Sequence, residues 1–473
     1  MTEKKKLVVL GAGVGGLSAG WMFARTGHYD VTVIERAPVT GGVCGTFRHE
    51  DFLLDYGPHK CYSAIEGVLD ELRRLMDGEL LTHEKSNALY LFGSFLKYPL
   101  SLVDLATKMG PVRAMQSGLS VAKTLLPNRT EAKSYEDYAV AKFGRAIYGM
   151  VFEPLAEKIW GDPSTLSADI ARTRIPSTSV FDVALRAAGL KKETSLTDAK
   201  HFYYPKRGFG RIPDRMVEEI EKAGGRVLTD TTPVRFEMRG SRVVAVDVER
   251  HGRTDTLLCD LLISSVPLDV LVGLLGGGTD PSLAPALKAA KTLQYRSAFL
   301  VYVFLNADAL TKDHWLFFPE RDVIFGRVFE QKRMSAEMAP RGRTALCCDF
   351  TDFEDGPLSR RSDQELADLC VRDLVKVGLI DKSQVTGTLV KRLPRFYPRY
   401  DLAYKETVGA LYESLKRFDN VLSTGRIGFY NYNNSDHCVD MGRFLADRVE
   451  AGTNTRDIWT ALERRVAEYR IVD

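Results

Sequence analysis

The pattern of apolar and polar positions in the first part of the chain predicts a strand, a helix and a second strand in close succession. Residues 7–10 form a short apolar run of the kind found in buried strands. Residues 17–24 have the spacing of a helix, and residues 31–34 are a β-branched run that leads into the acidic Glu35. A glycine-rich turn at residues 11–16 separates the first strand from the helix. This order predicts a β–α–β unit.

Farther along, the pattern predicts helix-rich and strand-rich stretches. Helical spacing recurs at residues 64–76, 102–108, 114–126, 135–151, 180–188 and 209–223. Strand-like runs lie at residues 88–92, 95–98, 226–229, 234–236, 242–249 and 261–266. We expect a second sheet to contain residues 296–306, 323–329 and 344–350. The pattern ends with a strand at residue 421, a turn at Gly425 and a final helix from Met441.

The glycine turn has the spacing that a dinucleotide site needs. Gly11 permits the tight turn, Gly13 lets the backbone approach a pyrophosphate, and Gly16 lets the helix pack closely on the strand. The start of the helix presents unpaired N–H groups to the phosphates, and Glu35 is placed to accept hydrogen bonds from a ribose. A glycine-rich turn without a ligand is the alternative, but all the parts occur in order, so we favour the dinucleotide site.

A second glycine pair favours FAD over NAD as the dinucleotide. Gly41 and Gly42 follow Glu35 and Arg36 within a few residues, where backbone can lie against the ribityl–pyrophosphate arm. The alternative for this pair is a loop that turns off the end of the strand. NAD(P)H remains possible as a reductant, although no second Gly-x-Gly-x-x-Gly motif follows a strand.

Composition limits the classes of protein. The chain has 473 residues, of which 45% are hydrophobic and 27% charged, with a net charge of +3, so we expect two or more domains and no nucleic-acid partner. No signal-peptide pattern precedes the first strand, and the apolar runs are shorter than a membrane span, so we expect a cytoplasmic protein. The seven cysteines show no C-x-x-C pair, so we expect reduced thiols and no metal site.

These observations predict an α/β fold. We expect a doubly wound, Rossmann-like FAD-binding domain, an inserted helical substrate domain and a second, mixed β-sheet of six or seven strands. The FAD-binding domain is expected at residues 1–100, 201–290 and 421–473, with the helical domain at residues 101–200 and the mixed sheet at residues 291–420.

Several motifs together resemble a known family. Residues 54–59 (LDYGPH), 158–161 (KIWG), 166–168 with 174–176, and 426–432 (RIGFYNY) resemble UDP-galactopyranose mutases. The wider set is the amine-oxidase and protoporphyrinogen-oxidase-like flavoproteins, which share the N-terminal motif and the element at residues 204–209. Residues 432–437 depart from bacterial mutases and are closer to eukaryotic mutases and oxidase-like relatives, which leaves the sugar open.

The resemblance implies roles for particular side chains at the substrate. His59 would lie beside the flavin ring, and Trp160 would form a wall of the pocket. Arg174 and Arg327 would hold the diphosphate of the nucleotide, and Tyr397 and Tyr430 would donate hydrogen bonds to it. The alternatives are a loop histidine, a core tryptophan, half-buried sheet tyrosines, and salt bridges to acids such as Glu330.

Further residues are expected at the cofactor. The resemblance places Arg426 and Asp436 at the flavin, with Asp436 near the ribityl chain. Backbone at Val234 and at residues 265–267 would contact the adenine and pyrophosphate side, although packing explains these positions equally well.

The resemblance implies a UDP-sugar pyranose–furanose mutase that uses reduced FAD, with N5 of the flavin as the nucleophile at the anomeric carbon. The partner would be a nucleotide sugar, and a homo-oligomer is possible. The alternative is a net redox enzyme: an amine-oxidase-like or protoporphyrinogen-oxidase-like oxidase, dehydrogenase or desaturase. A flavin-binding scaffold without turnover is a third possibility.

Overall fold

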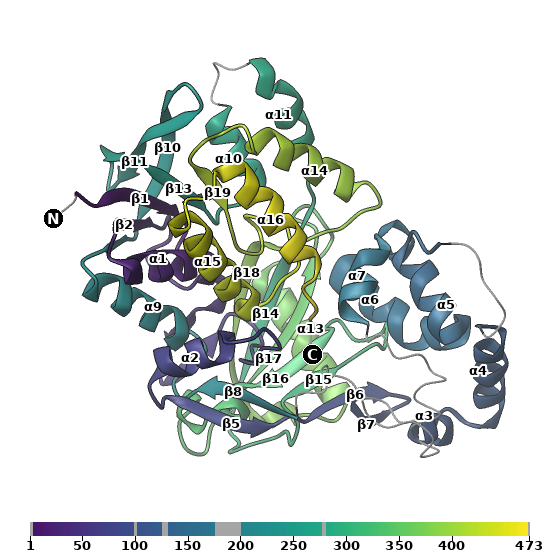
Figure 1. Cartoon of the computed structure of the whole chain (residues 1–473). Coiled ribbons are helices and arrows are strands. Elements are labelled where there is room, and N and C mark those ends of the chain that lie inside the picture. Colours follow the sequence, from purple (N-terminus) through teal and green to yellow (C-terminus); the bar gives the residue numbers. More distant parts are fainter. Residues whose placement is uncertain (1–2, 99–101, 125–130, 176–199, 277–280, 472–473) are drawn as a thin grey trace.

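Two large β-sheets form the framework of the protein. The computed structural model describes residues 3–98, 102–124, 131–175, 200–276 and 281–471. One large sheet has five strands and the other has seven (Figure 1). A group of helices stands beside them, at the right of the view in Figure 1.

The five-stranded sheet is parallel throughout and joins strands from the beginning, the middle and the last part of the chain. Its order is β19-β13-β1-β2-β9, with β1 Lys5–Leu10, β2 Tyr29–Ile34, β9 Arg226–Leu228, β13 Leu261–Ser264 and β19 Val421–Ser423. Its central strands are apolar along their length because a parallel sheet is covered on both faces. Leu7, Val9 and Ile263 are accordingly fully buried.

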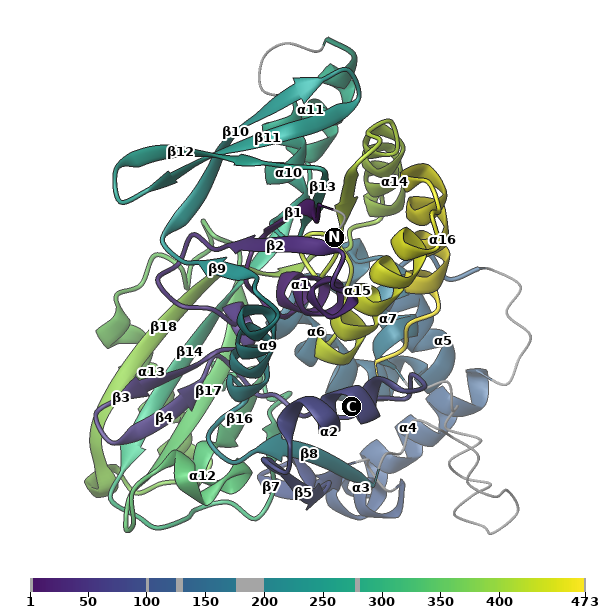
Figure 2. The same cartoon turned by 60° about the vertical axis from the view of Figure 1, so that its left-hand side comes forward.

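The two faces of this sheet are covered differently (Figure 2). One face carries α1 Val14–Thr26, α9 Arg211–Lys222 and α15 Ser435–Glu450. The other is covered by an antiparallel sheet of β10 Thr231–Arg239, β11 Arg242–Arg250 and β12 Arg253–Leu258. The predicted layered α/β fold is confirmed, with strands in place of helices in one outer layer.

The seven-stranded sheet is mixed, as predicted. Its order is β18-β14-β17-β16-β15-β6-β7, and among its pairs only β15 with β6 is parallel. The strands are β6 Asn87–Leu91, β7 Ser94–Tyr98, β14 Tyr295–Leu305, β15 Trp315–Phe317, β16 Arg327–Glu330, β17 Thr344–Asp352 and β18 Val385–Pro398. β6 and β7 therefore pair with this sheet, although they fall within the segment 1–100 expected for the FAD-binding domain.

The two faces of the seven-stranded sheet have different neighbours. α13 Asp363–Lys376 covers one face, where Leu366 and Leu374 share a buried cluster with Val301. The opposite face packs on β3 Thr46–His49 and β4 Phe52–Asp55, through a cluster that includes Tyr302 and Phe329. This second face is turned toward the segment that follows the glycine turns.

The predicted helical block is present wherever residues 101–200 are described. It contains α3 Leu102–Met109, α4 Pro111–Thr124, α5 Tyr135–Ile147, a π-helical turn Tyr148–Phe152, α6 Glu153–Trp160 and α7 Ala168–Arg174. α5 begins at a capping box in which Ser134 and Asp137 bond each other's backbone N–H groups. The helix predicted at residues 180–188 lies outside the described residues.

Some predicted boundaries are wrong. The helix expected from Met441 begins at Ser435, because Asn434 and His437 form a capping box there, and a further helix, α16 Thr455–Ala467, follows it. The strand expected at residues 323–329 is β16 alone, which begins at Arg327. The remaining elements are α2 Val68–Met76, β5 Leu80–Glu84, β8 His201–Pro205, α10 Leu268–Leu275, α11 Ala284–Ala290, α12 Gln331–Met334 and α14 Tyr404–Leu415.

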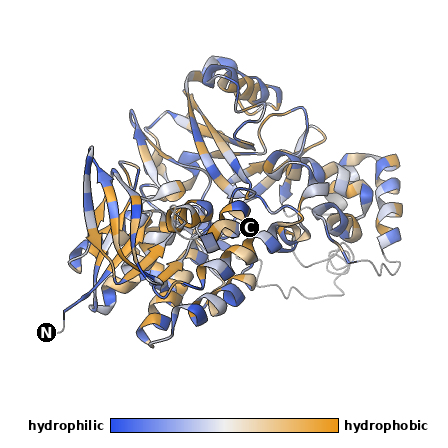
Figure 3. Cartoon of the chain, turned by 90° about the horizontal axis from the view of Figure 1, so that it is seen from above, coloured by the Kyte–Doolittle hydropathy of each residue, from blue (hydrophilic) through white to orange (hydrophobic). Residues whose placement is uncertain are grey.

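Hydrophobic residues run through both large sheets and the helices packed on them, and hydrophilic residues mark the turns and outer ends (Figure 3). All seven cysteines are buried and unpaired with one another. Along the described residues, none of the helices combines the length and the apolarity that crossing a bilayer requires.

Candidate functional site

The first glycine turn joins β1 to α1 with very little space. Gly11 has a φ of 92°, which is costly for other residues. A Cβ atom on Gly16 would lie 1.9 Å from the carbonyl oxygen of Gly11, so only glycine fits there. A Cβ on Gly13 would meet nothing within 4 Å. The turn is therefore closed between strand and helix and open at Gly13, where a pyrophosphate needs access.

The start of α1 is suited to an anion. Its N-cap residue, Gly13, makes no side-chain hydrogen bond, and no acidic residue lies in the first turn. Unpaired N–H groups and the positive end of the helix dipole are thus available there. The carboxylate of Glu35 accepts hydrogen bonds from the N–H of Ala12 (2.8 Å) and of Ala37 (2.9 Å), which fixes it beside the turn. Arg36 is exposed.

The second glycine pair lies against the first turn. Gly41 and Gly42 have φ of 93° and 54°. The N–H of Gly41 donates to the carbonyl of Ala12 at 2.7 Å, and Gly41 forms a β-bridge with Gly13. A Cβ on Gly42 would lie 3.3 Å from the Cα of Gly13. Both glycine motifs therefore form one surface, as the FAD prediction requires.

The far end of the chain completes this surface. A Cβ on Gly15 would lie 2.7 Å from the Cα of Gly425, so the turn after β19 lies directly on the start of α1. The hydroxyl oxygens of Ser264 and Thr424, at the carboxyl ends of β13 and β19, are buried without a hydrogen-bond partner in the described chain. Open space at Gly13, an uncapped helix and unpartnered buried oxygens fit a phosphate- and hydroxyl-rich cofactor such as FAD.

The other predicted cofactor residues border the same region. Arg426 follows Gly425, and its Nε donates to the carbonyl of Asn433 at 2.8 Å. Asp436 lies in the first turn of α15, buried, and accepts a hydrogen bond from the Ser63 hydroxyl at 2.9 Å. Val234 sits at a register shift between β10 and β11 and is 45% exposed, so its backbone lies outside the regular pairing.

His59 is held in a neutral state. Its ring stacks on Phe209 with centroids 4.7 Å apart, and its Nδ1 is buried without a hydrogen-bond partner in the described chain. Burial, together with the positive charges of Arg426 and Arg327, lowers the pKa of His59 to about 3. The imidazole therefore carries no charge at neutral pH and has a nitrogen available to a ligand.

Asp55 binds the backbone of Phe209, the residue on whose ring His59 stacks. Its carboxylate accepts hydrogen bonds from the Phe209 N–H (3.0 Å), the Thr46 hydroxyl (2.5 Å) and the Tyr204 hydroxyl. Burial raises the pKa of Asp55 to about 6, although these hydrogen bonds lower it. The bond to Phe209 links this carboxylate to the ring on which His59 stacks.

A cluster of cationic and aromatic side chains lies next to the loop at residues 426–434. The Arg174 guanidinium, at the end of α7, lies 4.5 Å from the Tyr432 ring centroid. The ring of Tyr432 stacks on that of Tyr397 of β18, with centroids 4.9 Å apart. Trp160 of α6 contacts the Tyr432 ring edge to face, with centroids 6.1 Å apart. Arg426 lies 5.3 Å from the Tyr397 ring. Three predicted substrate residues and one predicted flavin residue therefore meet around Tyr432.

Arg327 has a different acidic partner from the one considered in the sequence. Its Nε and Nη2 donate to Asp349 Oδ2 at 2.9 and 2.6 Å, because the two residues are direct cross-strand neighbours in β16 and β17. Glu330, the expected alternative partner, accepts instead from Thr311 and Thr344. Arg327 also lies 5.0 Å from the Trp315 ring. Its charge remains close enough to act on His59.

Tyr430 does not present its hydroxyl as predicted. The hydroxyl oxygen lies 2.6 Å from the Gln294 carbonyl and 2.9 Å from the Arg399 carbonyl, and the ring is 2% exposed. These backbone groups occupy the hydroxyl, so Tyr430 supports the wall of the site. Tyr432, two residues later, takes the central position. Sequence reasoning quoted Tyr432 only within a motif and gave it no role.

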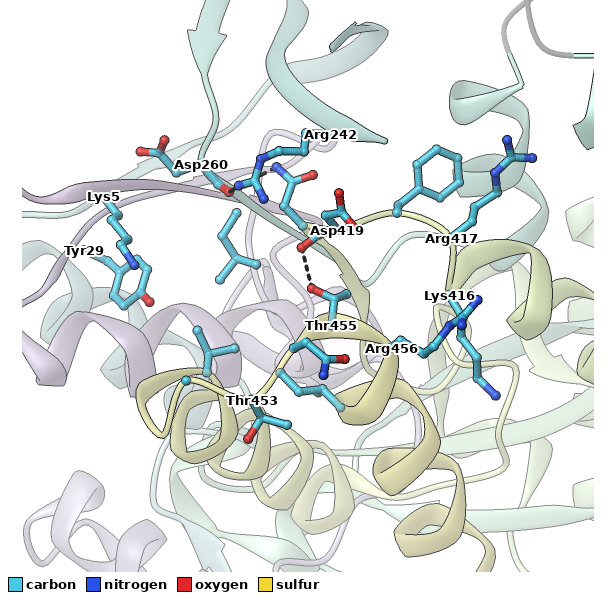
Figure 4. A pocket seen from close by; sticks show the side chains of 17 residues that line it. Lys5, Tyr29, Arg242, Asp260, Lys416, Arg417, Asp419, Thr453, Thr455 and Arg456 are labelled. Atoms are coloured by element: carbon cyan, nitrogen blue, oxygen red, sulfur yellow. Dashed lines mark hydrogen bonds between the residues drawn. The ribbon is translucent and has the colours of Figure 1, made fainter. Parts of the chain in front are cut away.

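A separate pocket lies at the amino ends of the strands of the parallel sheet, on the side away from the glycine turns. It measures about 630 Å³ and is lined by the first residues of β1, β2 and β13, namely Lys5, Tyr29 and Leu261 (Figure 4). The Thr455 hydroxyl donates to the carbonyl of Asp419 across it. Ligands of open parallel sheets bind at the carboxyl ends of the strands, so this amino-edge pocket is not the cofactor site.

The parallel sheet, its two glycine turns and the acid at the end of β2 define a dinucleotide-binding flavoprotein fold. Residues 14–430 match the model of the family described as flavin containing amine oxidoreductase, and the chain belongs to this family. It is therefore an FAD enzyme of the amine-oxidase superfamily, as predicted at that level.

Relatives of this chain have different activities. Coproporphyrinogen III oxidase from Bacillus subtilis (strain 168) is 22% identical, over 93% of this chain and 97% of that protein. A crystal structure of reduced UDP-galactopyranose mutase matches with a TM-score of 0.84 at 19% identity, over 98% of this chain and 99% of that chain. A redesigned putrescine oxidase matches with a TM-score of 0.65 at 14% identity, over 95% and 99%. These similarities establish the fold, and they do not distinguish a mutase from an oxidase.

Proposed function

We propose that this protein is an FAD-dependent mutase that interconverts the pyranose and furanose forms of a UDP-sugar. The observation that carries the proposal is the cluster around Tyr432. There, two guanidinium groups, from Arg174 and Arg426, meet two stacked tyrosine rings beside the glycine turns. Such a set suits a diphosphate next to a flat base or sugar.

In this proposal the chain binds and orients the nucleotide sugar. Arg174 and Arg327 hold the diphosphate, and a guanidinium fork matches its oxygen atoms as it leaves and returns. Trp160, which is 5% exposed, and Tyr432, which is 3% exposed, keep water from the sugar. Neutral His59 offers a hydrogen bond without repelling a cationic centre. Reduced FAD, when bound, supplies the nucleophile at the anomeric carbon, and NAD(P)H is a candidate reductant.

A net oxidation is the second candidate function. The similarity to coproporphyrinogen III oxidase extends over nearly the whole length of both chains. An oxidase substrate with acidic groups would use the same cationic side chains. The two functions differ in electron balance, since a mutase returns its flavin to the starting state while an oxidase passes electrons from each substrate molecule.

The test uses FAD-loaded protein reduced with dithionite without oxygen and given a panel of UDP-sugars. We expect ring-form conversion without a change in the flavin spectrum. Arg174→Ala and Arg327→Ala should each lower kcat/KM by about tenfold or more while FAD content stays unchanged, since each removes a charge-assisted hydrogen bond. Arg360→Ala, at an exposed arginine, is the matched control.

Two outcomes would contradict the proposal. Oxidised protein that is bleached by one equivalent of a substrate, with no ring conversion in reduced protein, would replace the mutase with an oxidoreductase. Full activity in both arginine variants would remove the diphosphate clamp.

A further inference from the structure

The outward face of α4 is a row of exposed apolar side chains. Val112 is 63% exposed, Met115 63% and Leu119 60%. Their spacing of three and four residues places them on one side of the helix. Among the large hydrophobic residues of the described chain, only Leu258 is exposed to a greater fraction. A contiguous apolar row of this kind is typical of an interaction surface.

The other face of α4 fixes the helix to the molecule. Ser117 is buried, and Ala114 packs on the cluster that contains Leu105 of α3. The Ser120 hydroxyl accepts a hydrogen bond from the N–H of Ala146 in α5 at 3.1 Å. α4 lies at the outer side of the helical block (Figure 1). The apolar row therefore faces outward from a helix that its neighbours hold in place.

The sequence around the row is basic. Residues 85–124 contain five basic residues and one acidic residue, a net charge of +4, against +3 for the whole chain. Arg113 and Lys123 belong to α4 and are exposed, and Lys108 lies in the last turn of α3. Lys123 follows Leu119 by one helical turn, so its charge lies on the side of the row. α4 itself contains no aspartate or glutamate.

A lipid surface with anionic headgroups fits these features. An amphipathic helix can lie in the plane of a membrane, with its apolar side chains at the acyl chains and its basic side chains at the phosphates. Such a surface requires no groove of matching shape, because the lipids rearrange around the helix. The 14 residues of α4 span about 21 Å, which is less than the roughly 30 Å of a bilayer core. The helix can therefore lie on a membrane and is too short to cross it.

Protein partners fit the row less well. A second copy that docked through the same face would bring Arg113 and Lys123 of both chains together, where like charges repel. Three side chains also cover much less than the roughly 800 Å² per partner of a stable protein interface. Partner peptides dock into grooves, whereas the row is the outer side of a helix. The charge and the shape of the row together favour lipid.

We propose that α4 attaches the protein to the surface of a membrane that contains anionic lipids. Val112, Met115 and Leu119 enter the boundary between headgroups and acyl chains, and Arg113 and Lys123 lie at the lipid phosphates. This inference is independent of the proposed function, because α4 carries none of the residues assigned to the cofactor or to the substrate.

The experiment measures cosedimentation of the FAD-loaded protein with lipid vesicles. One set of vesicles contains phosphatidylcholine alone, and in the other about a quarter of the lipid is phosphatidylglycerol. The original protein should bind the anionic vesicles at least about tenfold more tightly than the neutral ones. Salt at about 0.5 M should remove most of this difference, because it screens the lipid charge.

Two double variants separate the apolar and the basic contributions. Met115→Gln with Leu119→Gln should weaken binding to the anionic vesicles by about tenfold or more. Arg113→Gln with Lys123→Gln should lower the preference for anionic over neutral vesicles by about tenfold. FAD content and melting temperature should be unchanged in both, since the four side chains are exposed.

Leu258→Gln is the matched control, because Leu258 is an exposed leucine at the end of β12, on a different sheet. It should bind vesicles as the original protein does.

Two results would overturn the proposal. One is that the original protein does not bind anionic vesicles, and the other is that Met115→Gln with Leu119→Gln binds them equally well. If the original protein fails to bind and is a dimer in analytical ultracentrifugation while that variant is a monomer, the row is a contact between two copies of the chain.

Discussion

At the scale of the residue, burial sets the charge of the groups nearest the proposed flavin position. His59 is neutral because burial and two arginines oppose its protonation. Asp55, which holds the ring beneath it through Phe209, has a raised pKa although it accepts hydrogen bonds. A neutral imidazole on a rigid support is a suitable neighbour for a flavin whose own charge changes with its redox state.

The raised pKa of Asp55 predicts a pH dependence of stability. Between pH 3.8, the ordinary pKa of an aspartate, and about pH 6, the folded protein keeps a proton on Asp55 that the unfolded chain releases. The free energy of unfolding should therefore fall as pH rises through this window, by a contribution on the order of 3 kcal/mol. Asp55→Asn should lack this slope in chemical denaturation curves between pH 4 and 7.

The control for this prediction is Asp51→Asn, because Asp51 is exposed at the turn between β3 and β4. It should keep the slope of the original protein. An Asp55→Asn curve parallel to that of the original protein would show that Asp55 does not hold its proton on folding.

At the scale of the element, the sequence predicted those helices and strands whose pattern of apolar residues is continuous along the chain. β1, α1 and β2 were predictable because their apolar spacing and glycine turn are contiguous in sequence. The 14-residue β18 was missed because polar residues such as Lys391 and Arg392 interrupt its alternation. The partner of Arg327 was also missed, since Asp349 faces it only through the register of β16 and β17. Tyr432 was not distinguishable from a packing residue, because Arg174 and Tyr397, which contact it, lie far from it in the sequence.

The β1–α1 junction predicts a sharp asymmetry between two glycines. Gly16→Ala should destabilise the protein by at least about 2 kcal/mol, because its Cβ would overlap the Gly11 carbonyl. It should also lower FAD content, measured by absorbance of the purified protein. Gly118→Ala in α4, where a Cβ meets nothing within 4 Å, should instead stabilise by about 0.5 kcal/mol. Equal melting temperatures for the two variants would contradict this account of the turn.

At the scale of the whole molecule, the half-buried Lys158 and the buried Arg399 join the helical block to the seven-stranded sheet. Lys158 Nζ, near the end of α6, donates to the carbonyls of Phe318, Glu320 and Phe325 at 2.7, 2.7 and 3.0 Å. The Arg399 Nε donates to the carbonyl of Trp160 at 3.1 Å. The three carbonyls belong to the loop at residues 318–326 between β15 and β16, which Arg327 follows directly. Lys158 therefore fixes the position of Arg327 relative to Trp160.

This junction predicts a positioning role for Lys158. Burial lowers the pKa of Lys158 to about 7, and the neutral amine can donate at most two of the three hydrogen bonds. The KM of the original protein for the UDP-sugar should therefore rise as the pH increases from 7 to 8.5. Lys158→Met should show a KM raised about tenfold that no longer changes with pH, with FAD content unchanged.

Lys288→Met, at an exposed lysine in α11, is the control and should behave like the original protein. A pH-dependent KM in Lys158→Met would assign the titration to another group.

The contact between Gly15 and Gly425 has a consequence for synthesis of the protein. Translation makes the two faces of that contact more than four hundred residues apart, and β19 cannot join the sheet until its codons have been read. On the ribosome, β1 and α1 are therefore synthesised early. The contact of α1 with Gly425 forms only after the segment at residues 421–436 has been made. We therefore expect FAD to bind only after this last segment has joined the sheet, and the unpaired sheet edge of earlier fragments to be open to aggregation.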